Sequence, residues 1–356
     1  MMRVKLKDIT NYSKGSQINR DILLENGKYI YLNGGINPSG KWNAYNVSSK
    51  TITISEGGNS SGYINYITEP FWCGAHCYYL FDGPKNTKYL YYALKSQQER
   101  LFKIRSGACM PNIKKKDLGN FEFEFDFNEK IQIKIVSILD ECNKTINNYK
   151  LELELLDELV KARFVELFGT LDNPTFNYNK STLGELCYKI TDGKHGGCSL
   201  IQGSNRYFVG AREIYDDKVH YENAPEISVD DFEKDYRRCN VEVGDFLIVN
   251  TGATIGKSAI ATDKRTKHTL LQKSVALLKL NQDLLNPEFL KWCYRINTRM
   301  YLVESSSAQP NLLLSKIKAT EIYVPPIELQ NQFADFVKEV DKSRFIIKSM
   351  IKEGLL

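Results

Sequence analysis

One short phrase occurs twice in the chain, and this repetition constrains the fold more than any other feature of the sequence. The two copies are Cys109-Met110-Pro111-Asn112-Ile113 and Ala308-Gln309-Pro310-Asn311-Leu312, and each precedes a strand-like run and then a helical pattern that begins with Gln. Three further pairs of segments agree at a similar spacing: Leu6-Lys7-Asp8-Ile9 with Leu183-Gly184-Glu185-Leu186, Tyr29-Ile30-Tyr31 with Tyr207-Phe208-Val209, and Tyr89-Leu90 with Phe289-Leu290. Because the repeated unit has the size of a domain, the sequence predicts two similar halves and excludes a solenoid of short repeats.

Length and composition agree with two ordinary globular domains. The chain has 356 residues, of which 42% are apolar, and domains usually have about 100–200 residues. No stretch approaches the roughly 18 apolar residues that a membrane helix needs. The first residues lack the apolar core of a signal peptide, so a cytoplasmic protein is predicted. The eight cysteines are unevenly spaced. Only Cys73, His76 and Cys77 cluster, without the second ligand pair that a zinc site needs, and no metal is predicted.

The charge is weakly basic and unevenly distributed. The net charge is +5 for the whole chain. Residues 1–127 contain 17 basic and 11 acidic residues, residues 128–170 contain six and eight, residues 171–326 contain 20 and 19, and residues 327–356 contain five of each. The excess of positive charge therefore lies in the first globular half. This distribution permits a polyanionic partner without requiring one.

A long amphipathic helix is predicted between the two halves. Apolar residues from Ile135 to Leu167 recur at steps of three and four, with a mean of about 3.6, which is the period of an α-helix. The helix is expected to run from Glu129 to Phe168 and to end at Gly169 as its C-cap. Its length would be about 60 Å at 1.5 Å per residue.

A second, shorter amphipathic helix follows the second copy of the phrase. It begins near Gln330 and places Phe333, Val337, Val340 and Ile347 on one face. Because both helices carry an apolar stripe, they are predicted to pair as an antiparallel coiled coil. The alternative is that each helix packs only on its own domain.

The remaining segments indicate strands that run into glycine-containing loops. In residues 121–127, Phe alternates with acidic residues. This pattern predicts a half-buried strand with its carboxylates at the surface. Residues 51–54 and 245–249 predict further strands, followed by loops at residues 56–62 and 250–257. The string from Gly252 to Ser258 has three residues between its glycines, whereas a P-loop has four, so nucleotide binding is not expected.

The chain shows no persuasive catalytic arrangement, and its loops are instead rich in residues that contact nucleic acids. No nucleophile elbow, His-Glu-x-x-His helix or Asn-Pro-Pro-aromatic motif occurs. Arg, Lys, Asn and Gln bind base edges, while Ser, Thr and backbone N–H groups bind phosphates. The candidate DNA-binding residues are Lys14, Ser16, Asn19, Arg20, Asn33, Lys41, Trp42, Asn43, Tyr45, Asn59, Ser60, Ser61, Lys194, His195, Arg212, Asn250, Thr251, Thr254, Lys257, Lys264, Arg265, Lys267 and His268.

These features together resemble the DNA specificity subunit of type I restriction-modification enzymes, over essentially the whole chain. The resemblance rests on the two Pro-Asn phrases, on the segments Ile190–His195 and Gly252–Gly256, and on Pro325-Pro326-Ile327-Glu328-Leu329-Gln330. It implies an α+β fold in which two target recognition domains are joined by two long helices that pair as an antiparallel coiled coil. The implied domains are residues 1–127 and 171–326, and the implied conserved helical regions are residues 128–170 and 327–356.

The resemblance also implies a function. Each recognition domain would read one half of a bipartite sequence in double-stranded DNA, and the helices would set the spacer between the halves. The chain would be non-catalytic and would bind no cofactor or metal. Adenine methylation with S-adenosylmethionine would belong to two modification subunits, and ATP- and Mg²⁺-dependent translocation and cleavage would belong to restriction subunits where the complex contains them. No membrane partner is implied. The shorter second helix departs from the family pattern and leaves partner docking at that end open.

Two other classes of protein remain to be tested. A non-catalytic two-domain coiled-coil scaffold for protein partners would share the fold but not the DNA target. A DNA reader should lose affinity steeply with salt because it releases counterions, whereas an apolar scaffold should not. A self-contained nuclease or NTPase would show turnover by the isolated chain with Mg²⁺, ATP or S-adenosylmethionine.

Overall fold

The computed structural model describes residues 1–107, 110–297, 300 and 311–354, and it separates into two compact units, Met1–Asn147 and Asn148–Leu356. Cys109 and the segment Ala308–Pro310 of the repeated phrase lie outside the described residues. The boundary falls within a long helix, α5 (Glu129–Phe168). The predicted helical region 128–170 is thus shared between the first and the second unit, because its two ends pack on different domains.

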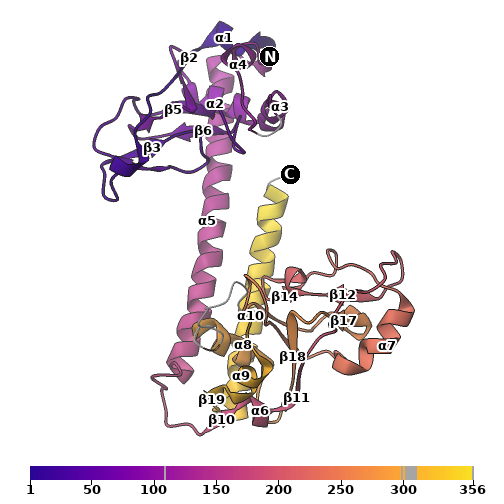
Figure 1. The fold of residues 1–356 in the computed structure, drawn as a ribbon. Helices are drawn as coiled ribbons and strands as arrows, with labels where there is room; N and C mark the ends of the chain where they lie inside the picture. The colour runs from indigo at the N-terminus through magenta and orange to yellow at the C-terminus, as the bar shows by residue number, and fades with distance from the viewer. Residues whose placement is uncertain (108–109, 298–299, 301–310, 355–356) are drawn as a thin grey trace. The chain divides into compact units, whose positions relative to one another are not determined.

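The first unit combines an antiparallel sheet with short helices (Figure 1). Its four-stranded sheet has the order β2-β8-β5-β6, β3 lies between β4 and β7 in a second sheet, and β1 pairs with β9. The elements are β1 (Met2–Lys5), α1 (Leu6–Ile9), β2 (Asn11–Lys14), η1 (Arg20–Ile22), β3 (Tyr29–Leu32), β4 (Gly40–Trp42), β5 (Thr51–Ser55), β6 (Ile64–Ile67), β7 (Trp72–Cys73), β8 (Cys77–Phe81), α2 (Thr87–Lys95), α3 (Gln98–Lys103), α4 (Lys115–Gly119) and β9 (Glu122–Phe125).

The second unit repeats this plan. Its four-stranded sheet has the order β11-β18-β15-β16, and β10 pairs with β19. Strands β12 and β17 pair in parallel, as β3 and β7 do in the first unit. The elements are β10 (Lys180–Thr182), α6 (Leu183–Leu186), β11 (Cys187–Asp192), β12 (Tyr207–Val209), η2 (Ala211–Glu213), β13 (Ile214–Tyr215), β14 (Lys218–Val219), α7 (Val229–Cys239), β15 (Phe246–Val249), β16 (Ser258–Ile260), η3 (Lys264–His268), β17 (Thr269–Leu271), β18 (Val275–Leu280), α8 (Pro287–Ile296), α9 (Leu314–Ala319), β19 (Glu321–Tyr323) and α10 (Ile327–Gly354).

The sequence anchors of the repeat become equivalent elements. The Leu-led pair of segments forms α1 and α6, and the Tyr-led pair forms β3 and β12. Helices α2 and α8 begin after Asn86 and Asn286, and each of these side chains caps its helix by accepting a backbone N–H. The prediction of two similar halves is confirmed. The second unit differs chiefly by the added helix α7 and the hairpin β13–β14.

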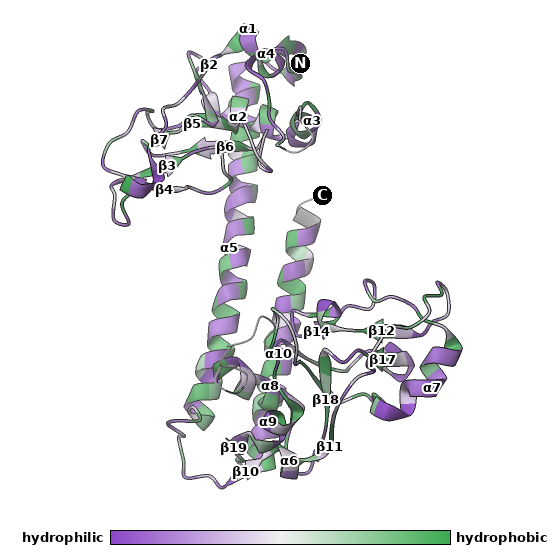
Figure 2. Ribbon diagram, in the orientation of Figure 1, coloured by the Kyte–Doolittle hydropathy of each residue, from purple (hydrophilic) through white to green (hydrophobic). Residues whose placement is uncertain are grey.

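The predicted strands are also confirmed. Strand β5 is buried along its whole length, as a central strand should be, and β15 likewise. In β9 the side chains of Phe123 and Phe125 are buried while Glu124 is exposed, which is the alternation expected for one wet face. The strand β18 of the second sheet is among the most hydrophobic parts of the chain (Figure 2).

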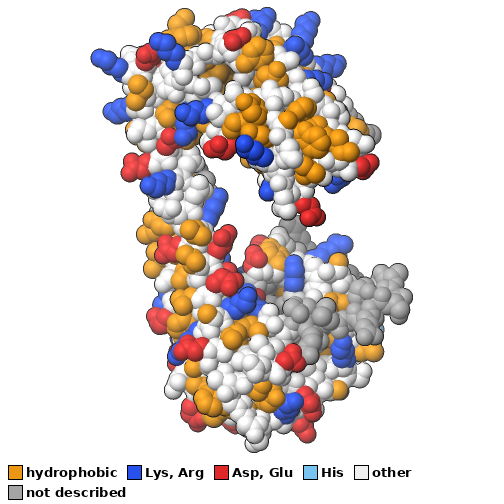
Figure 3. Space-filling view, turned by 90° about the vertical axis from the view of Figure 1, so that its left-hand side faces the viewer, with side chains coloured by type: hydrophobic (Ala, Val, Ile, Leu, Met, Phe, Trp, Pro, Cys, Tyr) orange, Lys and Arg blue, Asp and Glu red, His pale blue; other side chains and the backbone are white. Residues whose placement is uncertain are grey.

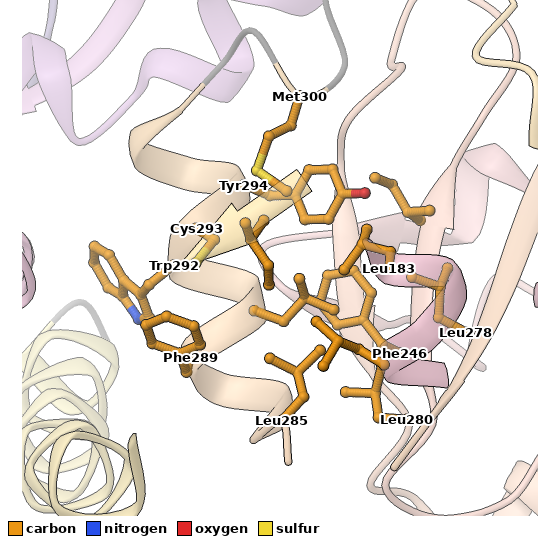
Figure 4. Packing of buried hydrophobic residues seen from close by; sticks show 14 of the residues in the cluster. Leu183, Phe246, Leu278, Leu280, Leu285, Phe289, Trp292, Cys293, Tyr294 and Met300 are labelled. Atoms are coloured by element: carbon orange, nitrogen blue, oxygen red, sulfur yellow. The ribbon is translucent and has the colours of Figure 1, made fainter. Parts of the chain in front are cut away.

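The core of the second unit lies between its sheet and α8. Phe246, Leu278 and Leu280 from the sheet lie on the side of α8 that carries Tyr294, whereas Phe289 and Trp292 lie on the opposite side of this helix (Figure 4). Tyr294 is buried in the same cluster, and burial raises the pKa of its hydroxyl. This core continues into the long helices, because Val160 and Phe164 of α5 belong to it as well.

Within the second unit, α10 runs antiparallel to the C-terminal part of α5. The ring of Phe333 lies 5.3 Å from that of Phe164 and 5.7 Å from that of Phe168. Eleven residues after Phe333, Arg344 donates to the Asp157 carboxylate at 2.5 Å and to the Leu156 carbonyl at 3.2 Å. Later residues of α10 thus contact earlier residues of α5. The antiparallel pairing is confirmed over this length, and α10 also packs on its own domain through the ring of Trp292.

The apolar stripe of α5 is buried over only part of its length. Ile138 is 52% exposed, and Cys142 is exposed. Helix α5 has 40 residues and α10 has 28, and Ile138 and Cys142 belong to the part of α5 that lies in the first unit.

Both long helices begin with a buried glutamine and α5 ends on a glycine. The Gln132 amide donates to the Asp126 carbonyl, and the Gln330 amide donates to the Pro325 carbonyl. Each glutamine therefore ties the helix to the strand that precedes it. Gly169 has φ +73° and donates to the Val165 carbonyl, which confirms it as the C-cap of α5.

Candidate nucleic-acid interface

In the first unit, five loop segments meet at one end of the four-stranded sheet. We call them the first loop cluster, which consists of residues 15–16, 32–34, 56–63, 73–77 and 111–113. Backbone hydrogen bonds join them: Ser16 N–H to Cys73 O, Gly74 N–H to Leu32 O, Glu56 N–H to His76 O and Ile113 N–H to Glu56 O, at 2.8–2.9 Å. The segment that contains Pro111 and Asn112 thus holds the glycine-containing loop in place through backbone hydrogen bonds.

In the second unit, the equivalent segments meet in the same way. The second loop cluster consists of residues 193–194, 209–212, 250–257, 271–275 and 311–312. The corresponding bonds are Lys194 N–H to Leu271 O, Gln272 N–H to Val209 O, Asn250 N–H to Ser274 O and Leu312 N–H to Asn250 O, at 2.7–3.0 Å. Gly57 pairs with Asn112 and Thr251 pairs with Asn311 in isolated antiparallel bridges. The two clusters therefore share one backbone framework.

One glycine in each cluster allows two segments to cross closely. A Cβ on Gly15 would lie 1.9 Å from the Cys73 carbonyl oxygen, and a Cβ on Gly193 would lie 2.1 Å from the Leu271 carbonyl oxygen. No other amino acid fits at such a crossing. This explains the glycine in the segment Ile190–His195, which carries part of the family resemblance.

The glycine-containing loops of the two clusters have the same conformation. Gly58 and Gly62 have φ of +75° and +83°, and Gly252 and Gly256 have φ of +99° and +89°. The N–H of Gly62 bonds to Ser55 O at 2.7 Å, as that of Gly256 bonds to Val249 O at 3.0 Å. Each loop is thus a hairpin turn with two left-handed residues four positions apart, which only glycine adopts readily.

The structure brings about half of the predicted residues into these clusters or to their edges. In the first unit these are Lys14, Ser16, Asn33, Asn59, Ser60 and Ser61. In the second unit they are Lys194, His195, Arg212, Asn250, Thr251, Thr254 and Lys257. Not all of them face solvent. Ser61 is fully buried and donates to the Glu56 carbonyl, and Asn250 is 4% exposed. Both residues belong to the framework, and we do not retain them as DNA contacts.

Two more predicted residues have structural partners. Asn33 accepts the N–H of His76 at 3.2 Å and so fixes the turn between β7 and β8. The Lys194 ammonium pairs with the Asp235 carboxylate of α7, which raises the pKa of the lysine. His195 remains 62% exposed at 3.2 Å from Asp192. Burial opposes ionisation of Asp192, but hydrogen bonds from Arg238 and His195 hold the pKa of its carboxyl below the usual range.

The other predicted residues of the first unit form a separate patch around η1 and β4. Asn19 caps η1 by accepting the Asp21 N–H, and Arg20 is exposed. Tyr45 is 53% exposed and packs edge-on against Tyr29 at 5.0 Å. Lys41, Trp42 and Asn43 lie on or beside β4. We call residues 19–20 and 41–45 the β4 patch.

The remaining predicted residues of the second unit lie on η3, which precedes β17 and is not part of the second loop cluster. Lys264, Lys267 and His268 are exposed there. Arg265 is different, because its guanidinium forms two hydrogen bonds to Asp263 and lies 4.7 Å from the centre of the Tyr221 ring. We call residues 264–268 the η3 patch.

Two exposed residues of the clusters were missed by sequence reasoning. His76 lies 3.5 Å from Glu56 and is 63% exposed, and Lys273 is exposed in the equivalent turn of the second unit. The signal that could have found them is the repeat itself, since β7–β8 and β17–β18 are equivalent. Lys273, Arg212 and Lys257 form no ion pair with any residue that the structure describes, so the second loop cluster carries uncompensated positive charge.

Comparison with known proteins identifies the fold and the family. The model of the type I restriction modification DNA specificity domain matches residues 1–156 and 177–356. The chain belongs to this family. The two matched stretches correspond to the two repeats. The family is one of specificity subunits, which select a target rather than perform the chemistry.

Individual relatives agree with this assignment. The chain is 29% identical over 192 residues to a putative type I specificity subunit of Mycoplasma genitalium, which covers 53% of this chain and 50% of that protein. It is 32% identical over 162 residues to another from Mycoplasma pneumoniae, which covers 44% of this chain and 40% of the relative. The matched stretch thus spans about half the length of these curated relatives.

Solved structures show the same fold. The crystal structure of the S subunit of a type I restriction-modification system from M. genitalium matches 99% of this chain and 92% of its own, with a TM-score of 0.64 and 22% identity. A structure reported for the assembly and conformational transition of the type I system matches 99% of this chain and 96% of its own, with a TM-score of 0.54 and 14% identity. At such identities the likeness establishes the fold alone.

The cysteines and histidines do not assemble into a metal site within the described residues. Among these residues, no group of three or more His, Cys, Asp or Glu side chains is arranged to hold a metal ion. Cys73 and Cys77 are buried, and their mutual contact together with burial raises the pKa of the Cys73 thiol. They act as small core residues. In the same part of the chain, no helix has the length and apolar character needed to cross a bilayer.

Proposed function

We propose that this chain is the sequence-specific DNA-binding subunit of a type I restriction-modification complex, in which each unit reads one half of a bipartite target in double-stranded DNA. The observation that carries the proposal is the pair of loop clusters, built on one framework but with different exposed side chains. A reader of two unlike half-sites needs this combination. The framework presents the loops, and the side chains that differ distinguish the bases.

The two long helices would set the spacer between the half-sites. Helix α5 has 40 residues, which corresponds to about 60 Å at 1.5 Å per residue. Its pairing with α10 stiffens the part of it that lies in the second unit. Half-site identity and spacer length would then be separate properties. Insertion of a helical turn into both helices should change the preferred spacer and leave the two half-sites unchanged.

The exposed apolar strip on α5 is the proposed docking surface for modification subunits. Leu151, Leu155 and Leu159 are 54%, 59% and 49% exposed, and their spacing of four places them along one side of the helix. Hydrophobic side chains follow the exposed length of this helix (Figure 3). An uncovered strip of this kind marks a protein interface. Two modification subunits, and restriction subunits in a restricting complex, would complete the assembly.

The chemistry would belong to these partners. The glycine-containing loop of the second unit lacks the spacing of a P-loop, so we assign no nucleotide to this chain. S-adenosylmethionine, ATP and Mg²⁺ would bind to the modification and restriction subunits. This chain would supply the recognition of the target.

A map of methylated sites tests the proposal. DNA modified by the assembled complex should carry methyl groups within two short fixed sequences, separated by a gap of constant length. Methylation without a shared sequence, or within one continuous sequence, would contradict it. The alternative of a protein scaffold makes a different prediction: its interaction with DNA would be absent, or would not weaken steeply as salt increases.

A further inference from the structure

The two loop clusters raise the question of which of their surfaces contacts the sugar-phosphate backbone, the part of DNA that is the same in every sequence. This step rests on the proposed function, by which the two units face different half-sites. Side chains that read bases should therefore differ between the units. An exposed feature that both units retain should instead contact what the half-sites share, which is the sugar-phosphate backbone.

The hairpin loops at residues 56–63 and 250–257 are the exposed feature that both units retain. Beyond the glycine bonds described above, the Tyr63 N–H bonds to Ser60 O as the Lys257 N–H bonds to Thr254 O, and the Ser55 N–H bonds to Tyr63 O as the Val249 N–H bonds to Lys257 O. In contrast, the tip side chains are not retained. Asn59 and Ser60 in the first loop correspond to Ala253 and Thr254 in the second.

Packing inside the units does not account for the shape of these tips. A Cβ added to Gly58 or Gly252 would meet no atom within 4 Å, and Asn59 and Ala253 are exposed. At the tips, the backbone N–H groups of residues 59–60 and 253–254 donate to no acceptor in the described part of the chain. Each loop therefore has two consecutive backbone donors without an acceptor among the described residues, in a conformation held by backbone bonds to residues 112–113 in the first unit and 311–312 in the second.

Positive charge surrounds the second of these tips. Lys257 is the last residue of the loop and is exposed. Lys273 lies in the turn that is tied to the loop by the Asn250 N–H bond to Ser274 O, at 3.0 Å. Arg212 follows Ala211, whose N–H donates to the Ser274 hydroxyl at 3.2 Å. An anion at the loop tip would thus find backbone donors and nearby cations together, which is the combination that phosphate groups select.

We propose that the two hairpin loops grip DNA phosphates through their backbone N–H groups and do not read sequence. Base identity is then read by exposed segments whose side chains differ between the units. In the first unit this segment is the β4 patch: Glu226 and Ile227 of the second unit bridge to Tyr207 and Leu200 as β4 pairs with Tyr29 and Leu24, but they carry other side chains. In the second unit it is the η3 patch, since residues 68–71 of the first unit form no helix.

The tip position Ala253 allows a matched test. The Ala253→Asn variant gives the second loop the side chain that the first loop carries at Asn59, and Ala253→Asp adds only a negative charge to the same shape. We expect Ala253→Asn to leave both half-sites unchanged and to alter affinity by less than about twofold. We expect Ala253→Asp to weaken binding to target and non-target DNA alike. Because the added negative charge offsets one nearby cation, the slope of log affinity against log salt should fall by about 0.9.

Both variants are measured in the full chain assembled with its modification subunits, by DNA titration at several salt concentrations and by a methylation map. A changed base preference in Ala253→Asn would show that the loop reads bases and would overturn the inference. Normal DNA affinity with impaired assembly in Ala253→Asp would also overturn it, because the loop would then dock a protein partner. Normal DNA affinity together with normal assembly in Ala253→Asp would overturn it as well, because the loop would then not contact phosphates.

The Asn59→Asp variant repeats the test in the first loop, where the wild-type side chain is already the neutral isostere. It should lower affinity in the same sequence-independent way. If the unmodified complex itself binds DNA without a steep dependence on salt, the proposed function fails. If that complex binds DNA with a steep salt dependence but the variants bind as tightly as the wild type, the inference about the loops fails and the proposed function stands.

Discussion

The first and second loop clusters have the same backbone hydrogen bonds but different charges. In the first cluster, Lys14 pairs with Glu56 and His76 lies beside the same carboxylate. In the second, Asn250 takes the position of Glu56, and nearby cations are left without a partner among the described residues. The comparison teaches that the framework of a recognition domain and its electrostatic surface vary independently. The first globular half has the excess of basic residues, but of the two loop clusters it is the second that has cations without an ion-pair partner among the described residues.

The units also differ in how their helices are anchored. In the second unit, Phe333 of α10 packs against Phe164, Phe168 and Trp292 and is fully buried. Its counterpart in α5, three residues after the buried glutamine, is Ile135, which is only partly buried. The first unit instead ties its helices by polar bonds: Asp140 of α5 accepts from Lys88 at 2.7 Å and from Tyr92 at 2.6 Å, both on α2.

The largest expected effect comes from removal of the aromatic anchor. Phe333→Ala should destabilise the second unit by about 3–5 kcal/mol, because a fully buried ring is replaced by a cavity. Ile135→Ala should cost the first unit only roughly 1–2 kcal/mol, because its side chain is only partly buried. Urea unfolding followed through Trp292, in a background with Trp42→Phe and Trp72→Phe, measures the first effect. An equal loss from Phe345→Ala, at a side chain that is 75% exposed, would show that the anchor is not specific.

The glycine crossings should respond equally in both units. Gly15→Ala and Gly193→Ala should each cost about 1–3 kcal/mol or more, because the added Cβ overlaps a carbonyl oxygen and forces the segments apart. Gly57→Ala and Gly197→Ala are the controls, since a Cβ there meets no atom within 4 Å. Thermal unfolding monitored by circular dichroism measures all four. A clear difference between Gly15→Ala and Gly193→Ala would mean that the two clusters do not share a framework.

The charge difference should appear in the binding of DNA. Combined replacement of Arg212, Lys257 and Lys273 by Gln should reduce the salt slope by roughly two to three, at about 0.9 for each phosphate that is no longer neutralised. Lys14→Gln should change it much less, because Glu56 already neutralises this lysine. Titration of non-specific DNA at several salt concentrations provides the measurement. If both changes have equal effect, the ion pair in the first cluster opens on binding.

Sequence reasoning reached the helices and the repeat but only part of the site. The bounds Glu129–Phe168 of α5 follow from a long periodic stripe and a glycine cap, which are local signals. The equivalence of the two hairpin loops was not found from the sequence. Equivalent segments of the two units are about 177 residues apart before helix α7, and about 195 residues apart after it, because α7 is an insertion. A comparison at one fixed spacing therefore fails across the insertion.

Side-chain environments within the site could not be predicted from local patterns either. Ser61 and Asn250 belong to polar loops, and only the tertiary structure shows that both are buried. Lys273 is an ordinary lysine in the sequence, and it joins the second loop cluster because its own N–H donates to the Lys194 carbonyl and the neighbouring Ser274 carbonyl accepts the Asn250 N–H. Residues that the fold brings together through backbone bonds cannot be recognised from their local sequence.

The smallest predicted effect concerns the polar tie between α2 and α5 in the first unit. Burial opposes ionisation of Asp140, but hydrogen bonds from Lys88 and Tyr92 lower the pKa of its carboxyl below 3.8 in the folded state. Burial and the bond to Asp140 also raise the pKa of Tyr92 to about 12, so the phenol remains a donor at neutral pH. The tie should contribute its full stability above about pH 4 and lose it as the pH falls through the lowered pKa.

The Asp140→Asn variant isolates this contribution. The difference in urea midpoint between the wild type and Asp140→Asn should be constant from about pH 7 to about pH 5 and should shrink below about pH 4, where the wild-type carboxyl becomes neutral as well. The second unit offers the control, because the residues that correspond to Lys88 and Asp140 are Glu288 and Lys338, and Glu288 pairs with Lys291 of its own helix instead. Lys338→Gln should therefore show no such dependence. A midpoint difference that grows as the pH falls would mean that Asp140 is held in its neutral form.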